Sequence, residues 1–147
     1  MYQDLEGTKL RRFETVALLF NPAVLPPECM PLRTEYLRGL WLSLFHDFKG
    51  VLRSDNIGLV EEHRKAILRV AALEASADIG LPMADRALAH AGLSLFRLLY
   101  NLGYDQEAKL VYRLAARRDL REGCRWQKIR RYAWLCVKEQ FGQHDAA

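Results

Sequence analysis

The chain has no long hydrophobic run. A membrane-spanning helix needs roughly 18 or more consecutive apolar residues, whereas the richest apolar stretch, Leu37 to Leu44, is interrupted by Arg38 and followed by charged residues. The sequence therefore predicts no integral membrane association. The first residues, MYQDLEGTKLRR, have acids before the basic pair and no small-residue cleavage site after an apolar segment. They do not resemble a secretory signal, and we expect a cytoplasmic location.

Cysteines are few, and the common catalytic motifs are missing. The three cysteines, Cys29, Cys124 and Cys136, form no metal-ligand spacing, and an odd number argues against a disulfide framework. The chain has no glycine-rich phosphate loop, no HExxH motif and no nucleophile elbow. We therefore expect no cofactor, no metal site and no catalytic residues. A catalytic site assembled from distant residues is the less favoured alternative.

What the chain does have is helical periodicity. Apolar residues recur every three or four positions, glycine and proline mark the breaks, and no long stretch alternates apolar and polar residues as a strand would. The chain has 147 residues, and half of them are hydrophobic, so it can bury one core without disulfides or metals. We predict an all-α single domain over residues 1–147, a compact bundle of about five to six helices.

The predicted domain has four parts. These are an N-terminal helix within residues 1–20, a proline-rich linker over 21–33, a main helical bundle over 34–141 and a disordered tail over 142–147. The helices expected in the bundle run from about Thr34 to Arg53, Ile57 to Ile79, Pro82 to Leu102, Asp105 to Arg118 and Arg121 to Phe141. Thr34 and Asp105 are the expected caps of their helices, and Pro82 is expected in a first turn.

The helix expected over 34–53 has the broadest apolar face, with Leu37, Trp41, Phe45 and Phe48 at helical spacing. Large apolar side chains of this kind are usually buried, so we predict that they form the core. The same aromatic face is also the best candidate for a homodimer interface. Both interpretations are kept, and the core is favoured.

One segment near the C-terminus carries a helical-hairpin pattern. Leu98 to Asp119, LLYNLGYDQEAKLVYRLAARRD, contains a Leu-Gly-Tyr turn, Glu107-Ala108, Tyr112 and an alanine pair. In these features it resembles the hairpin of the tetratricopeptide repeat. The resemblance covers only about one unit, because the roughly 34-residue period does not recur upstream. The proline that usually closes a repeat is also missing after Asp119. The resemblance implies a TPR-like helical hairpin and a scaffold that binds other proteins rather than performing chemistry.

The C-terminal part of the chain is strongly basic. From Lys109 to Lys138, ten cations accompany only Asp119 and Glu122, so this segment has a formal charge of +8 and the remainder of the chain, whose total is +4, has −4. The cations are Lys109, Arg113, Arg117, Arg118, Arg121, Arg125, Lys128, Arg130, Arg131 and Lys138. Their spacing predicts cationic outer faces on two successive helices. Arginine outnumbers lysine, which favours recognition of carboxylates or phosphates.

Such a surface suits clustered negative charge on another molecule. We expect a non-catalytic interaction protein, an adaptor or regulator, that binds an acidic protein partner through the basic helix pair. The alternative is a nucleic-acid-binding regulatory protein that uses the same surface on phosphates, with Tyr132 and Trp134 as contact residues. A solvated face without a partner is the third interpretation. The predicted binding residues are Lys109, Arg113, Arg117, Arg121, Arg125, Lys128, Arg131, Lys138 and Trp134.

The helical spacing also predicts which residues of the last helix are buried and where two histidines lie. On the last helix the residues expected to be buried are Trp126, Ile129, Ala133, Cys136 and Val137. His90 is expected on the polar side of the fourth helix with Arg86 and Arg97, whereas His63 is expected on an apolar face. A buried, hydrogen-bonded histidine is favoured there over a ligand or base. An enzyme built around His63 would need a polar cavity beside Glu74.

Overall fold

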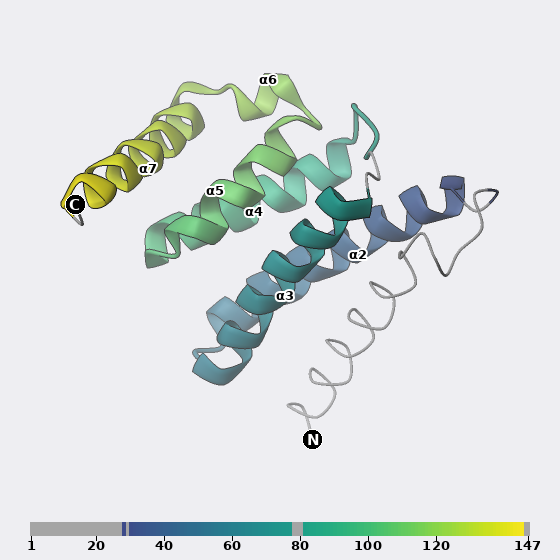
Figure 1. Cartoon of the computed structure of the whole chain (residues 1–147), viewed down its shortest axis with the longest axis horizontal. Coiled ribbons are helices and arrows are strands. Elements are labelled where there is room, and N and C mark those ends of the chain that lie inside the picture. Colours follow the sequence, from purple (N-terminus) through teal and green to yellow (C-terminus); the bar gives the residue numbers. More distant parts are fainter. Residues whose placement is uncertain (1–27, 29, 78–80, 146–147) are drawn as a thin grey trace. The chain divides into compact units, whose positions relative to one another are not determined.

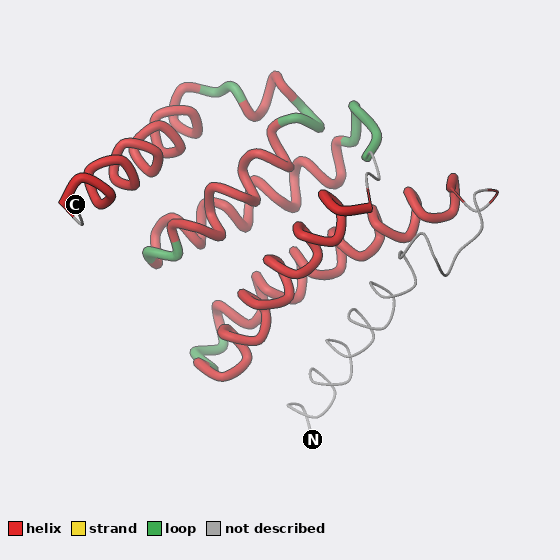
Figure 2. The backbone as a smooth tube through the Cα atoms, in the orientation of Figure 1, coloured by secondary structure: helices red, strands yellow, loops and turns green. Residues whose placement is uncertain are grey.

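The computed structural model describes residue 28, residues 30–77 and residues 81–145 of the chain (Figure 1). Within these ranges it forms six helices and no strand. The helices are α2 (Met30–Arg53), α3 (Ile57–Ala77), α4 (Arg86–Leu102), α5 (Asp105–Ala116), α6 (Leu120–Gly123) and α7 (Trp126–Asp145). Short connections separate α2 from α3 and join α4, α5, α6 and α7 in turn (Figure 2). The all-α prediction is confirmed, and the expected N-terminal helix lies outside the described residues.

The chain divides into two compact units, Met1–Pro82 and Met83–Ala147. The first unit contains α2 and α3, and the second contains α4 to α7. The expectation of one domain over the whole chain stays a prediction.

In the first unit, α2 packs against α3. The aromatic face of α2 is buried at Leu37, Trp41, Phe45 and Phe48. The indole Nε1 of Trp41 donates a hydrogen bond to Glu74 Oε2 of α3 at 3.1 Å. The core interpretation of this face is therefore confirmed. The alternative prediction of a homodimer interface on this face is wrong, because these four side chains are fully buried and cannot contact a second copy.

The start of α2 differs from the prediction. The helix begins at Met30, so residues 30–33 of the expected linker are helical and Thr34 is not the cap. Pro31 falls in the first turn of the helix. The first amide groups of a helix have no intrahelical acceptor, so a proline there loses no hydrogen bond. The other residues of the expected linker, except residue 28, lie outside the described residues.

His63 of α3 is a buried core residue, as predicted. Its Nδ1 lies 2.8 Å from the carbonyl oxygen of Leu59. A carbonyl oxygen can only accept, so Nδ1 carries the proton. The imidazole ring also packs on Phe48, with ring centroids 5.5 Å apart.

In the second unit, α4 and α5 form the hairpin that the Leu-Gly-Tyr turn predicted (Figure 1). Gly103 ends α4 in the left-handed conformation, with a φ of 84°, which glycine adopts without strain. The start of α4 was predicted wrongly. Asp85 caps it by accepting a hydrogen bond from Leu88 N, so Pro82 lies before the helix. Asp105 is the first residue of α5, and the preceding Tyr104 occupies the cap position.

The expected last helix is two helices, α6 and α7. Asp119 caps α6 by accepting from Glu122 N at 3.3 Å. Gly123 passes directly against α5, because a Cβ there would lie 2.6 Å from Ala116 Cβ. Tyr112 of α5 donates its hydroxyl to Gly123 O at 2.7 Å. These contacts with α5 fix the position at which α6 ends and the chain turns into α7. Beyond it α7 continues to Asp145, so residues 142–145 of the expected tail are helical.

The side of α7 that faces α5 was predicted wrongly. Leu135 is buried, and Tyr132 stacks on Tyr112 of α5 with ring centroids 4.5 Å apart. Of the residues expected inside, Ile129 and Cys136 are half-buried. The exposed ones are Trp126, Ala133 and Val137. The helix has apolar residues on two sides, and periodicity alone does not say which side meets a neighbour.

Candidate anion-binding pocket

The cations of the basic segment do not form one continuous surface. Lys109 is buried on α5, where its Nζ pairs with Glu139 of α7. Lys138 of α7 pairs with Asp105 of α5 at 3.3 Å. Both pairs join the two helices, so these lysines are compensated structural charges. The prediction of Lys109 as an exposed binding residue is wrong, because position 109 lies on the buried side of α5.

The charge of Lys109 acts strongly on its partner. Its hydrogen bond and positive charge hold the pKa of the Glu139 carboxyl below the ordinary value, and the nearby charge of Arg113 acts in the same direction. Glu139 therefore stays ionised opposite Lys109 at neutral pH. The α5–α7 interface, defined by Lys109, Lys138, Asp105, Glu139 and the stacked Tyr112–Tyr132 pair, is electrically balanced.

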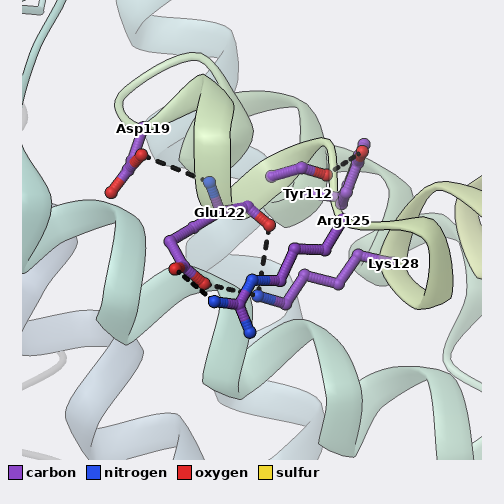
Figure 3. A network of polar contacts seen from close by, with 6 residues as sticks. Tyr112, Asp119, Glu122, Arg125 and Lys128 are labelled. Carbon is purple, nitrogen blue, oxygen red and sulfur yellow. Dashed lines mark hydrogen bonds and ion pairs between the residues drawn. The ribbon is translucent and has the colours of Figure 1, made fainter.

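A second group of charges gathers around α6 (Figure 3). Glu122 binds two cations at once, Arg125 at 3.1 Å and Lys128 at 3.3 Å. Lys128 also donates to the backbone oxygen of Glu122 at 3.2 Å. Asp119 is held as the cap of α6. Both carboxylates of this region therefore already serve the local structure.

Beside this network lies a pocket of about 760 Å³, lined by α4, by the α6 region and by the first turns of α7. Its lining residues with ionisable side chains are Arg86, His90 and Arg97 of α4 with Asp119, Arg121, Glu122, Arg125, Lys128 and Arg131. Lysine and arginine thus supply six cations against two carboxylates. Part of the lining is apolar, because Ala89, Leu93 and Phe96 contribute to it and are buried.

The α4 wall of the pocket follows from helical spacing. Arg86, His90 and Arg97 are exposed, and they share one side of the helix because they lie four and then seven residues apart. The backbone amide of Asp85 donates to Arg118 O at 2.9 Å. This bond ties the start of α4 to the chain that leads into α6.

Three arginines of the lining keep their charge uncompensated. Within the part of the chain that the structure describes, no ion pair joins Arg86, Arg97 or Arg121 to a carboxylate. Arg131 lies over the ring of Tyr100, 5.7 Å from its centroid. The pocket therefore has an excess of positive charge around a partly apolar surface, and a bound anion would relieve the repulsion between the guanidinium groups.

The structure divides the predicted binding residues into two groups. Those that line the pocket are Arg121, Arg125, Lys128 and Arg131, and those that lie elsewhere are Lys109, Arg113, Arg117, Lys138 and Trp134. Arg113 and Arg117 are exposed as predicted. Trp134 is exposed beneath Lys138, whose Nζ lies 5.9 Å from the ring centroid.

Sequence reasoning missed the α4 wall as part of a site. It placed Arg86, His90 and Arg97 together on the polar side of the helix, and that grouping was the available signal. These three residues are distant in sequence from the basic segment, and only the packing of α4 beside α6 brings the two groups into one pocket.

No three or more His, Cys, Asp or Glu side chains gather as a metal site among the described residues. No helix in the described ranges is long and apolar enough to cross a membrane. A comparison of the chain with protein-family models, curated proteins and solved structures found no significant match.

Proposed function

We propose that this protein is a non-catalytic helical interaction protein, an adaptor or regulator, that binds an acidic segment of a partner protein in the pocket between α4, α6 and α7. The observation that carries the proposal is the charge of that pocket. Six Lys and Arg side chains line it against two carboxylates, and both carboxylates are engaged by the local structure.

The chemistry of the lining fits carboxylates on a peptide. A guanidinium group presents planar, paired donors that match the two oxygens of a carboxylate. Arg86, Arg97 and Arg121 supply three such groups on two sides of the pocket. Leu93 and Phe96 line the pocket but are buried, so a peptide would be bound chiefly through the charged side chains.

The distribution of charge favours a protein ligand over a nucleic acid. A phosphate backbone is best matched by a long series of uncompensated cations. Four cations of the basic segment are instead paired with acids, namely Lys109, Arg125, Lys128 and Lys138. The uncompensated arginines converge on a concave pocket. Nucleic-acid binding remains the alternative function that the experiment must distinguish.

The test is fluorescence anisotropy with a labelled glutamate-rich peptide and with labelled single-stranded and duplex oligonucleotides, at low and near-physiological salt. The pocket variant carries Arg86→Glu, Arg97→Glu and Arg121→Glu. The control variant carries Arg113→Glu, Arg117→Glu and Arg130→Glu, which makes the same charge change at exposed residues outside the pocket. We expect the pocket variant to lose about 100-fold or more in peptide affinity and the control variant about 3-fold or less.

Circular dichroism of both variants checks that the helices are kept. Equal loss of peptide affinity in the two variants would contradict a localised site, because it would show a general attraction to positive charge. Oligonucleotide binding that exceeds peptide binding and falls steeply with salt would favour the nucleic-acid alternative.

A further inference from the structure

The side of α7 that points away from α5 is apolar. Its large exposed residues are Trp126, Trp134, Val137 and Phe141, with exposed fractions of 72, 50, 38 and 64%. Ala133 and Arg130 lie on the same side and are exposed as well. A helix at the edge of a helical array usually has a polar outer face, because that face meets water. Within the second unit, no described residue covers the apolar stripe on this helix.

The stripe has an internal symmetry. Its members lie at positions 126, 130, 133, 134, 137 and 141, which are mirrored about the point between 133 and 134. If a second α7 packs antiparallel on the first about this point, Trp126 lies opposite Phe141 of the second copy. Ala133 lies opposite Trp134 of the second copy, so a small side chain meets the largest one at the centre. A twofold interface requires such self-complementarity.

The charge in the stripe selects the direction of packing. In an antiparallel pair, Arg130 lies opposite Val137 of the second copy, one turn from that copy's Trp134 and Phe141. Arginine side chains stack favourably on aromatic rings. The two Arg130 residues are then separated along the helix axis by about 10 Å, from roughly 1.5 Å of rise per residue. A parallel pair would instead place Arg130 against Arg130 and Trp134 against Trp134.

The area of the stripe predicts the strength of the contact. Fully exposed aromatic side chains offer about 150 to 250 Å² each, so the exposed fractions give on the order of 500 Å² for each copy. Two copies would bury on the order of 1,000 Å², which is slightly below the range of stable interfaces and characteristic of weak complexes.

We propose that the outer face of α7 is a homodimer interface, in which two copies of the chain pack antiparallel through Trp126, Ala133, Trp134, Val137 and Phe141. The dimer is weak and reversible. It is independent of the anion-binding pocket, because none of these five residues lines that pocket. It also differs from the dimer interface predicted on α2, whose aromatic residues are buried.

Sedimentation equilibrium of the full chain tests the association. Between about 1 µM and about 1 mM we expect the average mass to rise from monomer toward dimer. The variant Trp134→Glu should stay monomeric over this range, whereas the control Gln106→Glu, at an exposed position of α5, should behave as the wild type. A wild-type protein that remains monomeric throughout would overturn the proposal. A dimer that survives Trp134→Glu would also overturn it.

Cysteine cross-linking tests the direction of packing. In a background with Cys29→Ser, Cys124→Ser and Cys136→Ala, the variant Ala133→Cys places two thiols next to the twofold axis, and we expect it to form a disulfide-linked dimer. The variant Arg130→Cys places the two thiols about 10 Å apart along the axis, too far to bridge. Equal cross-linking of both variants would indicate parallel packing and overturn the antiparallel interface.

Discussion

The α5–α7 interface and the anion-binding pocket draw on the same basic segment, and they use its charges differently. At the α5–α7 interface, Lys109 and Lys138 pair with Glu139 and Asp105, so each cation is neutralised. In the pocket, arginines outnumber the carboxylates, and those carboxylates already hold α6 and its neighbours. A paired cation holds two helices together, whereas an uncompensated cation is available to a ligand. We therefore expect substitutions at the first region to change stability and substitutions at the second to change binding.

The largest expected effect is at Lys109. The substitution Lys109→Glu places a carboxylate at a buried position opposite Glu139, and like charges in such a site repel strongly. We expect the free energy of unfolding, measured by urea denaturation, to fall by about 2 to 4 kcal/mol. The matched control is Arg113→Glu, one turn along the same helix and exposed, which should cost less than about 1 kcal/mol. Equal losses in the two variants would remove the distinction between paired and uncompensated cations.

A smaller loss of stability is expected from Tyr112→Phe. The hydroxyl of Tyr112 is the donor to Gly123 O, so its removal leaves a buried carbonyl oxygen without that partner. We expect the free energy of unfolding to fall by about 1 to 2 kcal/mol. Tyr100→Phe is the control, because it changes a half-buried tyrosine of α4 by the same atom. An unchanged midpoint for Tyr112→Phe would show that the bond does not hold α6 against α5.

The stacked tyrosines also predict a dependence on alkaline pH. Burial, with the nearby Cys124 and Tyr132, raises the pKa of Tyr112 above 10.0, and burial with the Cys136 thiol raises the pKa of Tyr132. A raised pKa favours the protonated phenol in the folded state. Its contribution to stability is therefore complete below pH 10 and is lost as the pH rises through the folded pKa values.

The measurement is urea denaturation at a series of pH values from about 8 to 11. We expect the unfolding free energy of the wild type to decline above pH 10, and the double variant Tyr112→Phe and Tyr132→Phe to decline less over the same interval. A steeper decline in the double variant would contradict this assignment.

The smallest expected effect concerns the carboxylates of the pocket. Glu122→Gln removes one of the two carboxylates among the lining residues and releases Arg125 and Lys128. We expect the glutamate-rich peptide to bind about 3- to 10-fold more tightly, with a change in unfolding free energy below about 1 kcal/mol because these ion pairs are partly exposed. Glu139→Gln is the matched control. It should weaken the fold without changing peptide affinity, since Glu139 lies outside the pocket.

The sequence predicted those features that depend on neighbouring residues. The all-α class and the C-terminal end of α2 followed from helical spacing, and the C-terminal end of α4 followed from Gly103. The burial of Trp41 and of His63 followed from their places on apolar helix faces. In each case the residues that determine the structure lie within a few helical turns of one another, so their spacing in the sequence predicts it.

The sequence alone determined that the chain is helical and that its C-terminal part is rich in arginine. The role of each charge depends on the residues that the fold places beside it. Lys109 is neutralised because α7 brings Glu139, thirty residues away, onto α5. Arg86 and Arg97 join Arg121 in one pocket because α4 packs beside α6. Which side of α7 is buried was decided in the same way, by the stacking of Tyr132 on Tyr112. The energy of a charge or of an apolar face depends on what the fold places against it, and that partner is distant in sequence.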